Sequence, residues 1–175
     1  MNRFALILKH RWRDLSDTRA ALSDAAAERL GARIAASEAR HTGEVRIVVE
    51  GGLPLSYLWR LGPGLSVPGA VRQRALSWFG RLRIWDTEHN NGVLIYLMLA
   101  ERRVEVLADR GLTRHVGASD WHAMVERLGQ RLRAQAFEDG LTEALEEVSA
   151  LLVQHFPAST NQARPNQLSN SVVRC

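Results

Sequence analysis

The stretch VLIYLMLAERRVEVLA, residues 93–108, decides the fold. Its first part, residues 93–99, is almost continuously apolar, which is typical of a strand buried on both faces. Residues 103–108 form a second β-rich run, and residues 100–102 are too few to hold a crossover helix. The two runs are therefore predicted to pair as an antiparallel hairpin, with residues 93–99 at the centre of a sheet.

A strand, a helix and the hairpin follow one another along the chain. Residues 44–50, EVRIVVE, are rich in β-branched side chains and have the length of a strand. Residues 51–69 hold three prolines and five glycines, and we expect a loop there. Helical spacing of apolar residues resumes over 70–82. Because this helix connects 44–50 to 93–99, the two strands should run parallel with a right-handed crossover.

Three more helices are expected to cover the sheet. Residues 23–41 have a Ser-Asp start and an amphipathic pattern. Residues 119–135 begin with Ser119 as the predicted N-cap, and residues 137–155 end before a Phe-Pro pair. With helices on both faces, the predicted fold is an α/β three-layer sandwich (α/β/α) around a small mixed sheet.

The length of 175 residues and the 46% hydrophobic content indicate one compact domain. We assign residues 1–22 to an N-terminal arm and residues 23–157 to the α/β domain. Residues 158–175 are polar and contain proline, and we expect them to form an extended or disordered tail.

The composition also bears on location. The longest apolar run, residues 92–100, is about half of the roughly 20 residues that a membrane-spanning helix needs, so no transmembrane segment is predicted. The N-terminus lacks the small-residue cleavage site of a signal peptide. Cys175, the single cysteine, has no partner for an internal disulfide. These features favour a reducing, cytoplasmic compartment.

The formal charge of +4 does not predict a nucleic-acid partner. Only Lys9 among the 23 basic residues is a lysine, which excludes phosphate-binding loops and Schiff-base chemistry that depend on lysine. The arginines alternate with acids along the chain, as on solvated helix faces. The sequence has no GxSxG, HExxH or dinucleotide-binding motif, and we expect no organic cofactor.

The predicted topology gathers polar residues at one end of the sheet. The loop that enters strand 93–99 lies at the same end as Asp109, because strand 103–108 runs back antiparallel. The residues expected to converge there are Asp86, Glu88, Asn90, Asn91 and Asp109. Carboxylate and amide oxygens without thiolates suit calcium or magnesium better than a soft metal.

Two alternatives concern the same residues. Arg110 could bind a phosphate through its planar fork or pair with one of the carboxylates. The run Asn-Asn-Gly at 90–92 and the run Asp109-Arg110-Gly111 are also common turn sequences, in which Gly111 would supply a positive φ angle.

The N-terminal arm mixes apolar and basic residues over residues 1–15. Such a segment could lie on an anionic membrane surface or contact a membrane protein. It could also dock on its own domain, and the sequence leaves both open.

Residues 85–111, WDTEHNNGVLIYLMLAERRVEVLADRG, resemble the TPM domain family, named after a thylakoid lumen phosphatase, a photosystem repair protein and a receptor modulator. The resemblance extends to HTGEVRIVVE at 41–50 and to the end of the predicted helix 137–155. It is strongest to a bacterial branch without signal peptide or membrane anchor. The tail sequence NQLSNSVV, residues 166–173, is similar to an extended C-terminal motif of that branch.

The resemblance implies an α/β/α sandwich and either calcium binding or acid phosphatase activity. The implied metal site would fall on Asp86, Glu88, Asn91 and Asp109, and the candidate catalytic residues are Asp86, Asp109 and Arg110. Asn90 stands where many members carry an aspartate, which should weaken metal affinity.

We favour a calcium-type module that acts as a binding or assembly factor near membrane proteins, in the cytoplasm or peripheral to the inner membrane. No nucleophile with an evident activating base is present. The alternative is an acid phosphatase-like hydrolase that uses the same acidic site.

Overall fold

The computed structural model describes residues 3–11, 15–158 and 167–175. Its centre is a four-stranded sheet in the order β3-β2-β1-β4. The strands β1 (Val45–Glu50) and β2 (Val93–Met98) are parallel, and β2 pairs antiparallel with β3 (Arg103–Ala108). The predicted parallel pair and the predicted hairpin are both confirmed.

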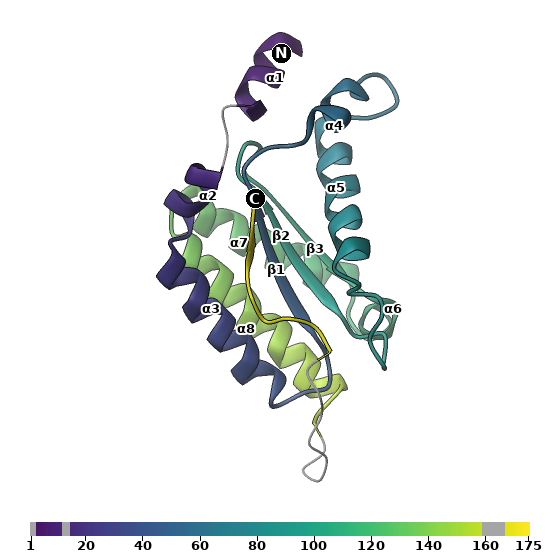
Figure 1. The fold of residues 1–175 in the computed structure, drawn as a ribbon. Coiled ribbons are helices and arrows are strands. Elements are labelled where there is room, and N and C mark those ends of the chain that lie inside the picture. Colours follow the sequence, from purple (N-terminus) through teal and green to yellow (C-terminus); the bar gives the residue numbers. More distant parts are fainter. Residues whose placement is uncertain (1–2, 12–14, 159–166) are drawn as a thin grey trace.

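Helices cover both faces of this sheet (Figure 1). One face packs against α3 (Asp24–Glu38), α7 (Ala118–Arg133) and α8 (Phe137–His155), whose apolar residues form one core. The other face packs against α4 (Leu55–Trp59) and α5 (Val67–Arg81), which form a second core. The predicted α/β/α sandwich is therefore confirmed.

The two central strands feed both cores, because successive side chains of a strand point to opposite faces. Ile47 and Ile95 belong to the core under α3 and α8, whereas Val48 and Leu94 belong to the core under α5. Every residue of β1 and β2 is buried. The sequence of β2 is continuously apolar because both faces of this strand are buried.

Three local predictions need correction. α7 begins at Ala118, because Gly117 already has the extended backbone that precedes a helix, so Ser119 lies in the first turn and is not the N-cap. The predicted loop 51–69 contains α4. α5 starts at Val67, where the Ser66 hydroxyl caps the first turn by accepting from the Gly69 N–H at 3.3 Å.

The end of the chain adds an edge strand that the sequence pattern did not predict. β4 (Val173–Arg174) pairs parallel with β1, opposite Val48 and Val49. In Figure 1 the yellow C-terminal segment runs beside β1. The sheet is thus completed by a segment far in sequence from β1, the strand with which it pairs.

The N-terminal arm forms α1 (Arg3–Arg11) and α2 (Leu15–Ala21); residues 1–2 and 12–14 of the arm lie outside the described residues. Leu6 is buried in the core under α5, so α1 docks on its own domain. His10 is also buried, and its Nδ1 accepts the Leu53 backbone N–H at 3.0 Å.

The ring of His10 must be neutral in this position, because Nδ1 acts as an acceptor. Burial lowers the pKa of His10, although the nearby Glu101 carboxylate, 2.9 Å from Nε2, opposes that shift.

Within the helices described for this chain, none is long and apolar enough to cross a membrane.

Candidate functional site

The loop before β2 and the residues after β3 are joined by backbone hydrogen bonds. The Asp109 N–H donates to the Gly92 carbonyl at 2.9 Å, and the Gly111 N–H donates to the Asn90 carbonyl at 2.8 Å. Asn90, Gly92 and Asp109 therefore meet at one end of the hairpin. Of the five residues predicted from topology to converge here, these hydrogen bonds bring together the backbone of Asn90, of Asn91 between Asn90 and Gly92, and of Asp109.

The turn geometry at this junction differs from the simple expectation. Asn90 has a φ of 52° and supplies the left-handed conformation, whereas Gly111 does not have a positive φ. Gly111 is needed for another reason: a Cβ there would collide with the carbonyl oxygens of His89 and Asn90. The expectation about the φ of Gly111 was wrong, and close packing of two backbones is the physical reason for this glycine.

Asn91 is fully buried at this junction. Its backbone N–H donates to the Thr87 hydroxyl at 3.1 Å, and its Nδ2 donates to the Thr42 hydroxyl at 3.0 Å. These contacts fix the amide so that Oδ1 is the remaining polar atom. Oδ1 is buried and has no hydrogen-bond partner in the described part of the chain.

Asp109 shows the same feature. It is the N-cap of α6 (Arg110–Thr113), and its Oδ1 accepts the Arg110 backbone N–H at 2.6 Å. Its Oδ2 is buried and finds no donor within residues 3–11, 15–158 and 167–175. A buried acceptor without a donor costs about 1–3 kcal/mol, and more when it is charged.

The other two predicted carboxylates are placed differently. Asp86 is exposed and pairs with Arg83 at 2.7 Å. Glu88 is exposed, and its backbone N–H donates to the Gln167 Oε1 at 3.3 Å. Among the described residues, no three His, Cys, Asp or Glu side chains are grouped closely enough to hold a metal ion. The structure thus places Asn91 and Asp109 at the same backbone junction, with Glu88 on the adjoining loop. The assignment of ligands stays a prediction.

Arg110 is exposed, and its Nε donates to the Asn90 Oδ1 at 3.1 Å. Its side chain thus contacts an amide of the loop before β2. This contact links the start of α6 to the loop before β2. It adds to the backbone hydrogen bonds that already join these two segments.

A pair of glutamates, Glu38 and Glu44, lies near the start of β1. Glu38 accepts the Val45 N–H at 3.0 Å, and burial raises the pKa of Glu38 to about 7, with the nearby Glu44 charge adding to the shift. Glu44 is buried and accepts the backbone N–H groups of Gln167 and Leu168. These acids therefore hold the C-terminal segment.

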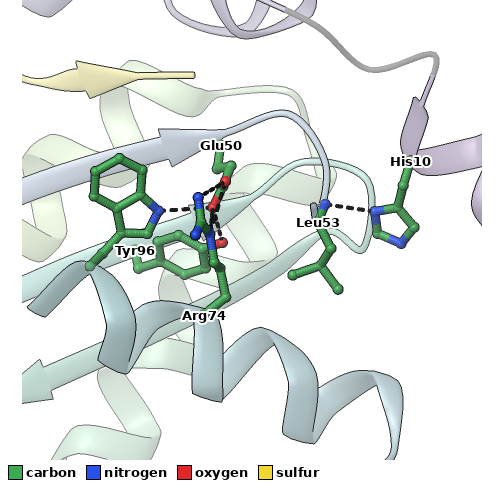
Figure 2. Close-up of polar contacts among 6 residues, drawn as sticks. His10, Glu50, Leu53, Arg74 and Tyr96 are labelled. Atoms are coloured by element: carbon green, nitrogen blue, oxygen red, sulfur yellow. Dashed lines mark hydrogen bonds and ion pairs between the residues drawn. The ribbon is translucent and has the colours of Figure 1, made fainter. Parts of the chain in front are cut away.

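A buried polar cluster around Glu50 was not predicted from the sequence. Glu50 ends β1, and Figure 2 shows Arg74 and Tyr96 directed at its carboxylate. Arg74 of α5 donates through Nε and Nη2 at 2.6–3.0 Å, the Tyr96 hydroxyl donates at 2.7 Å, and the Trp78 Nε1 donates at 2.9 Å. Burial raises the pKa of Tyr96 far above its ordinary value.

This cluster links three elements at the end of the sheet opposite to Asn91 and Asp109, since Glu50 pairs with Met98 and Val45 with Val93. Both oxygens of Glu50 already accept hydrogen bonds, which indicates a structural role. One sequence signal could have found it: a glutamate at the end of an apolar strand and an arginine inside the helix 70–82 both fall where burial is predicted.

A family model described as the TPM domain matches residues 15–151. No curated protein matches the chain. The NMR structure of the BA42 protein from the psychrophilic bacterium Bizionia argentinensis is similar, with a TM-score of 0.72 and 21% identity, covering 88% of this chain and 95% of that one.

The N-terminal domain of a protein from P. gingivalis, solved by solution NMR, is also similar. Its TM-score is 0.57 at 21% identity, covering 79% of this chain and 82% of that chain. At such identities the likeness to both structures concerns the fold.

Proposed function

This chain belongs to the TPM domain family, as its central sequence indicated, and we propose that it is a binding module with a weak divalent-cation site where the loop before β2 meets the end of β3. The two central ligands of this proposal are the side-chain oxygens of Asn91 and Asp109. Calcium is favoured over magnesium, and no organic cofactor takes part.

One observation carries the proposal. Asn91 Oδ1 and Asp109 Oδ2 are buried acceptors at the same junction, and neither has a donor in the chain as described. Two acceptors cannot satisfy each other, so each needs a cation or a hydrogen-bond donor from outside the described residues. A cation coordinated by both oxygens would remove the free-energy cost of burying them without a partner.

The donor set determines the kind of cation. Carboxylate and amide oxygens are hard ligands, and calcium tolerates an irregular set that includes water and backbone carbonyls. Magnesium demands near-ideal octahedral geometry. Asp109 is the one carboxylate at the centre of the site, with Glu88 and Asp86 at its rim, so affinity should be low.

The contacts of Asp109 and Arg110 favour binding over phosphate hydrolysis. Asp109 uses one oxygen to cap α6, and Arg110 donates its Nε to Asn90. The remaining oxygen of Asp109, Oδ2, is buried and is therefore not accessible for attack on a phosphate. A phosphate clamp that used the Nε of Arg110 would have to break its contact with Asn90. Phosphatase activity is therefore the alternative to be tested on the same preparation.

The cation proposal predicts a shift in thermal stability. Calcium at about one hundred times its dissociation constant should stabilise the fold by about 2.7 kcal/mol. Asp109→Asn should abolish most of this stabilisation, and Asp86→Asn should reduce it less because Asp86 pairs with Arg83. Thermal denaturation against calcium concentration measures both effects.

Asp139→Asn is the matched control, since Asp139 is an exposed acid at the start of α8. A calcium response that is unchanged in Asp109→Asn would contradict the site. Hydrolysis of p-nitrophenyl phosphate that is lost in Asp109→Asn would favour the phosphatase.

We also propose that the module acts beside membranes through α1. Leu8 is 53% exposed on this helix, beside Arg11 and Lys9, although Leu6, His10 and the ion pair of Lys9 with Glu101 are used for docking. Each basic residue near an anionic surface contributes about 1 kcal/mol. Leu8 could contact the apolar part of the membrane while α1 stays docked on the domain.

This second proposal predicts that the full chain cosediments with phosphatidylserine vesicles in a salt-sensitive way. Leu8→Glu should reduce the bound fraction several-fold. Leu76→Glu, at an equally exposed leucine of α5, should not. Equal binding by all three chains would exclude α1 as the contact.

A further inference from the structure

The last nine residues, Gln167–Cys175, form a segment that contacts the domain over its whole length; we call it the C-terminal segment. Its end pairs with β1 as a parallel strand. The Cys175 N–H donates to the Val49 carbonyl at 3.0 Å, and the Gly51 N–H donates to the Cys175 carbonyl at 2.7 Å. The segment therefore adds a strand to the edge of β1 by backbone hydrogen bonds.

Charged side chains form hydrogen bonds at both ends of the C-terminal segment. At its start, the buried Glu44 carboxylate accepts the N–H groups of Gln167 and Leu168 at 3.2 and 3.3 Å. At its end, the Arg174 guanidinium donates to the Leu22 carbonyl at 3.0 Å and to Asp24 at 2.5 Å. The domain thus recognises two neighbouring backbone N–H groups and one side-chain charge.

Apolar side chains of the segment enter both cores. Leu168 and Val173 pack against the core under α5, and Val172 packs against the core under α3 and α8. The backbone passes close to α3, because a Cβ at Gly31 would lie 3.2 Å from the Asn170 carbonyl oxygen. A cavity of about 510 Å³ borders this passage.

The groups that pair with the segment's backbone and with Arg174 come from residues 22–51, more than 115 positions away in sequence. The Glu88 N–H also donates to the Gln167 side chain. The contacts define a groove with its own hydrogen-bonding edge, an acid at each end and apolar sites between them. Such a groove recognises an extended peptide whether or not the peptide is covalently attached.

We propose that the edge of β1 is a peptide-binding groove that the C-terminal segment fills within its own chain, and that the same segment of a second copy of this chain can fill it in exchange. The second copy is the occupant that the contacts favour, since its segment carries the same Arg174 for Asp24 and the same apolar anchors. Reciprocal exchange of identical elements forms a closed dimer.

A charge swap on full-length chains tests the exchange. Asp24→Arg has a mismatched groove and a normal segment, whereas Arg174→Glu has a normal groove and a mismatched segment. Each variant alone is mismatched both within the chain and between identical copies. A mixture of the two offers matched charges at both grooves of a heterodimer.

Sedimentation velocity is expected to show a dimer in the equimolar mixture and monomers in each variant alone at the same total concentration. Circular dichroism of each variant provides the check on folding; Asp24 is largely exposed, which favours a folded variant. A mixture that sediments as monomers would overturn the proposal.

A labelled synthetic peptide of residues 167–175 gives an independent measurement. Its fluorescence anisotropy should rise saturably with the full-length Arg174→Glu chain, and at least ten-fold more of the wild-type chain should be required, because the wild-type segment competes. No saturable binding, or equal binding of a scrambled peptide, would contradict the groove. Peptide binding without a heterodimer would overturn the second copy as its occupant.

Discussion

Arg74→Met is expected to lower the free energy of unfolding by about 3–5 kcal/mol, the largest effect of any single substitution considered for this chain. The variant would leave the Glu50 carboxylate buried without its main partner, with only the Tyr96 hydroxyl and the Trp78 Nε1 still donating to it. Methionine fills a similar volume, so the loss would come from the uncompensated charge. Urea denaturation monitored by tryptophan fluorescence measures it.

Arg72→Met provides the matched control on the same helix. Arg72 pairs with Glu105 at 2.9 Å, but its side chain is 56% exposed, and such pairs contribute about 0–1 kcal/mol. The double variant Glu50→Leu/Arg74→Met should recover much of the lost stability, because it removes both buried charges. An Arg74→Met chain as stable as Arg72→Met would contradict a supporting role for this cluster.

Gly92→Ala is expected to have the next largest effect, a loss of about 1–3 kcal/mol in unfolding free energy. A Cβ at Gly92 would collide with the Ile84 carbonyl oxygen and side chain. Two backbone segments meet there, and backbone atoms cannot move aside as a flexible side chain can. The same substitution should weaken calcium binding, since Gly92 follows Asn91.

Gly80→Ala tests whether this loss is specific. Gly80 lies inside α5 with no atom within 4 Å of the added Cβ, so alanine should stabilise the helix by about 0.4–1 kcal/mol. Chemical denaturation of both variants measures the difference. A Gly92→Ala chain with wild-type stability would mean that the approach to Ile84 is less close than described.

The order of strands and main helices could be predicted from the sequence because each has a strong local signal. Residues 93–99 are continuously apolar, and the short connection to 103–108 leaves a hairpin as the natural solution. The start of α7 was missed by one residue, since the choice between Gly117 and Ser119 depends on backbone geometry. β4 was missed because two paired residues carry no periodic pattern.

The candidate site shows the same division. Topology predicted that Asn90, Asn91 and Asp109 would meet, because a strand pair fixes which ends lie together. Topology did not predict the directions in which the side chains point or the partners that they contact. Asp86 pairs with Arg83 at the surface, a choice that depends on side-chain rotamers. The Glu50–Arg74 pair joins residues 24 positions apart on different elements, and charge in a buried element was its one signal.

The measurement that tests the cation site most directly is a calcium titration of the ¹⁵N-labelled full chain followed by ¹H–¹⁵N correlation spectra. We expect saturable shifts at the backbone amides of residues 87–92 and 109–113 and at the side-chain amide of Asn91. The amides at the Glu50 end of β1 should not shift. Asp109→Asn should remove these shifts. Spectra that do not change, or shifts confined to the other acids near Glu38 and Glu44, would contradict it.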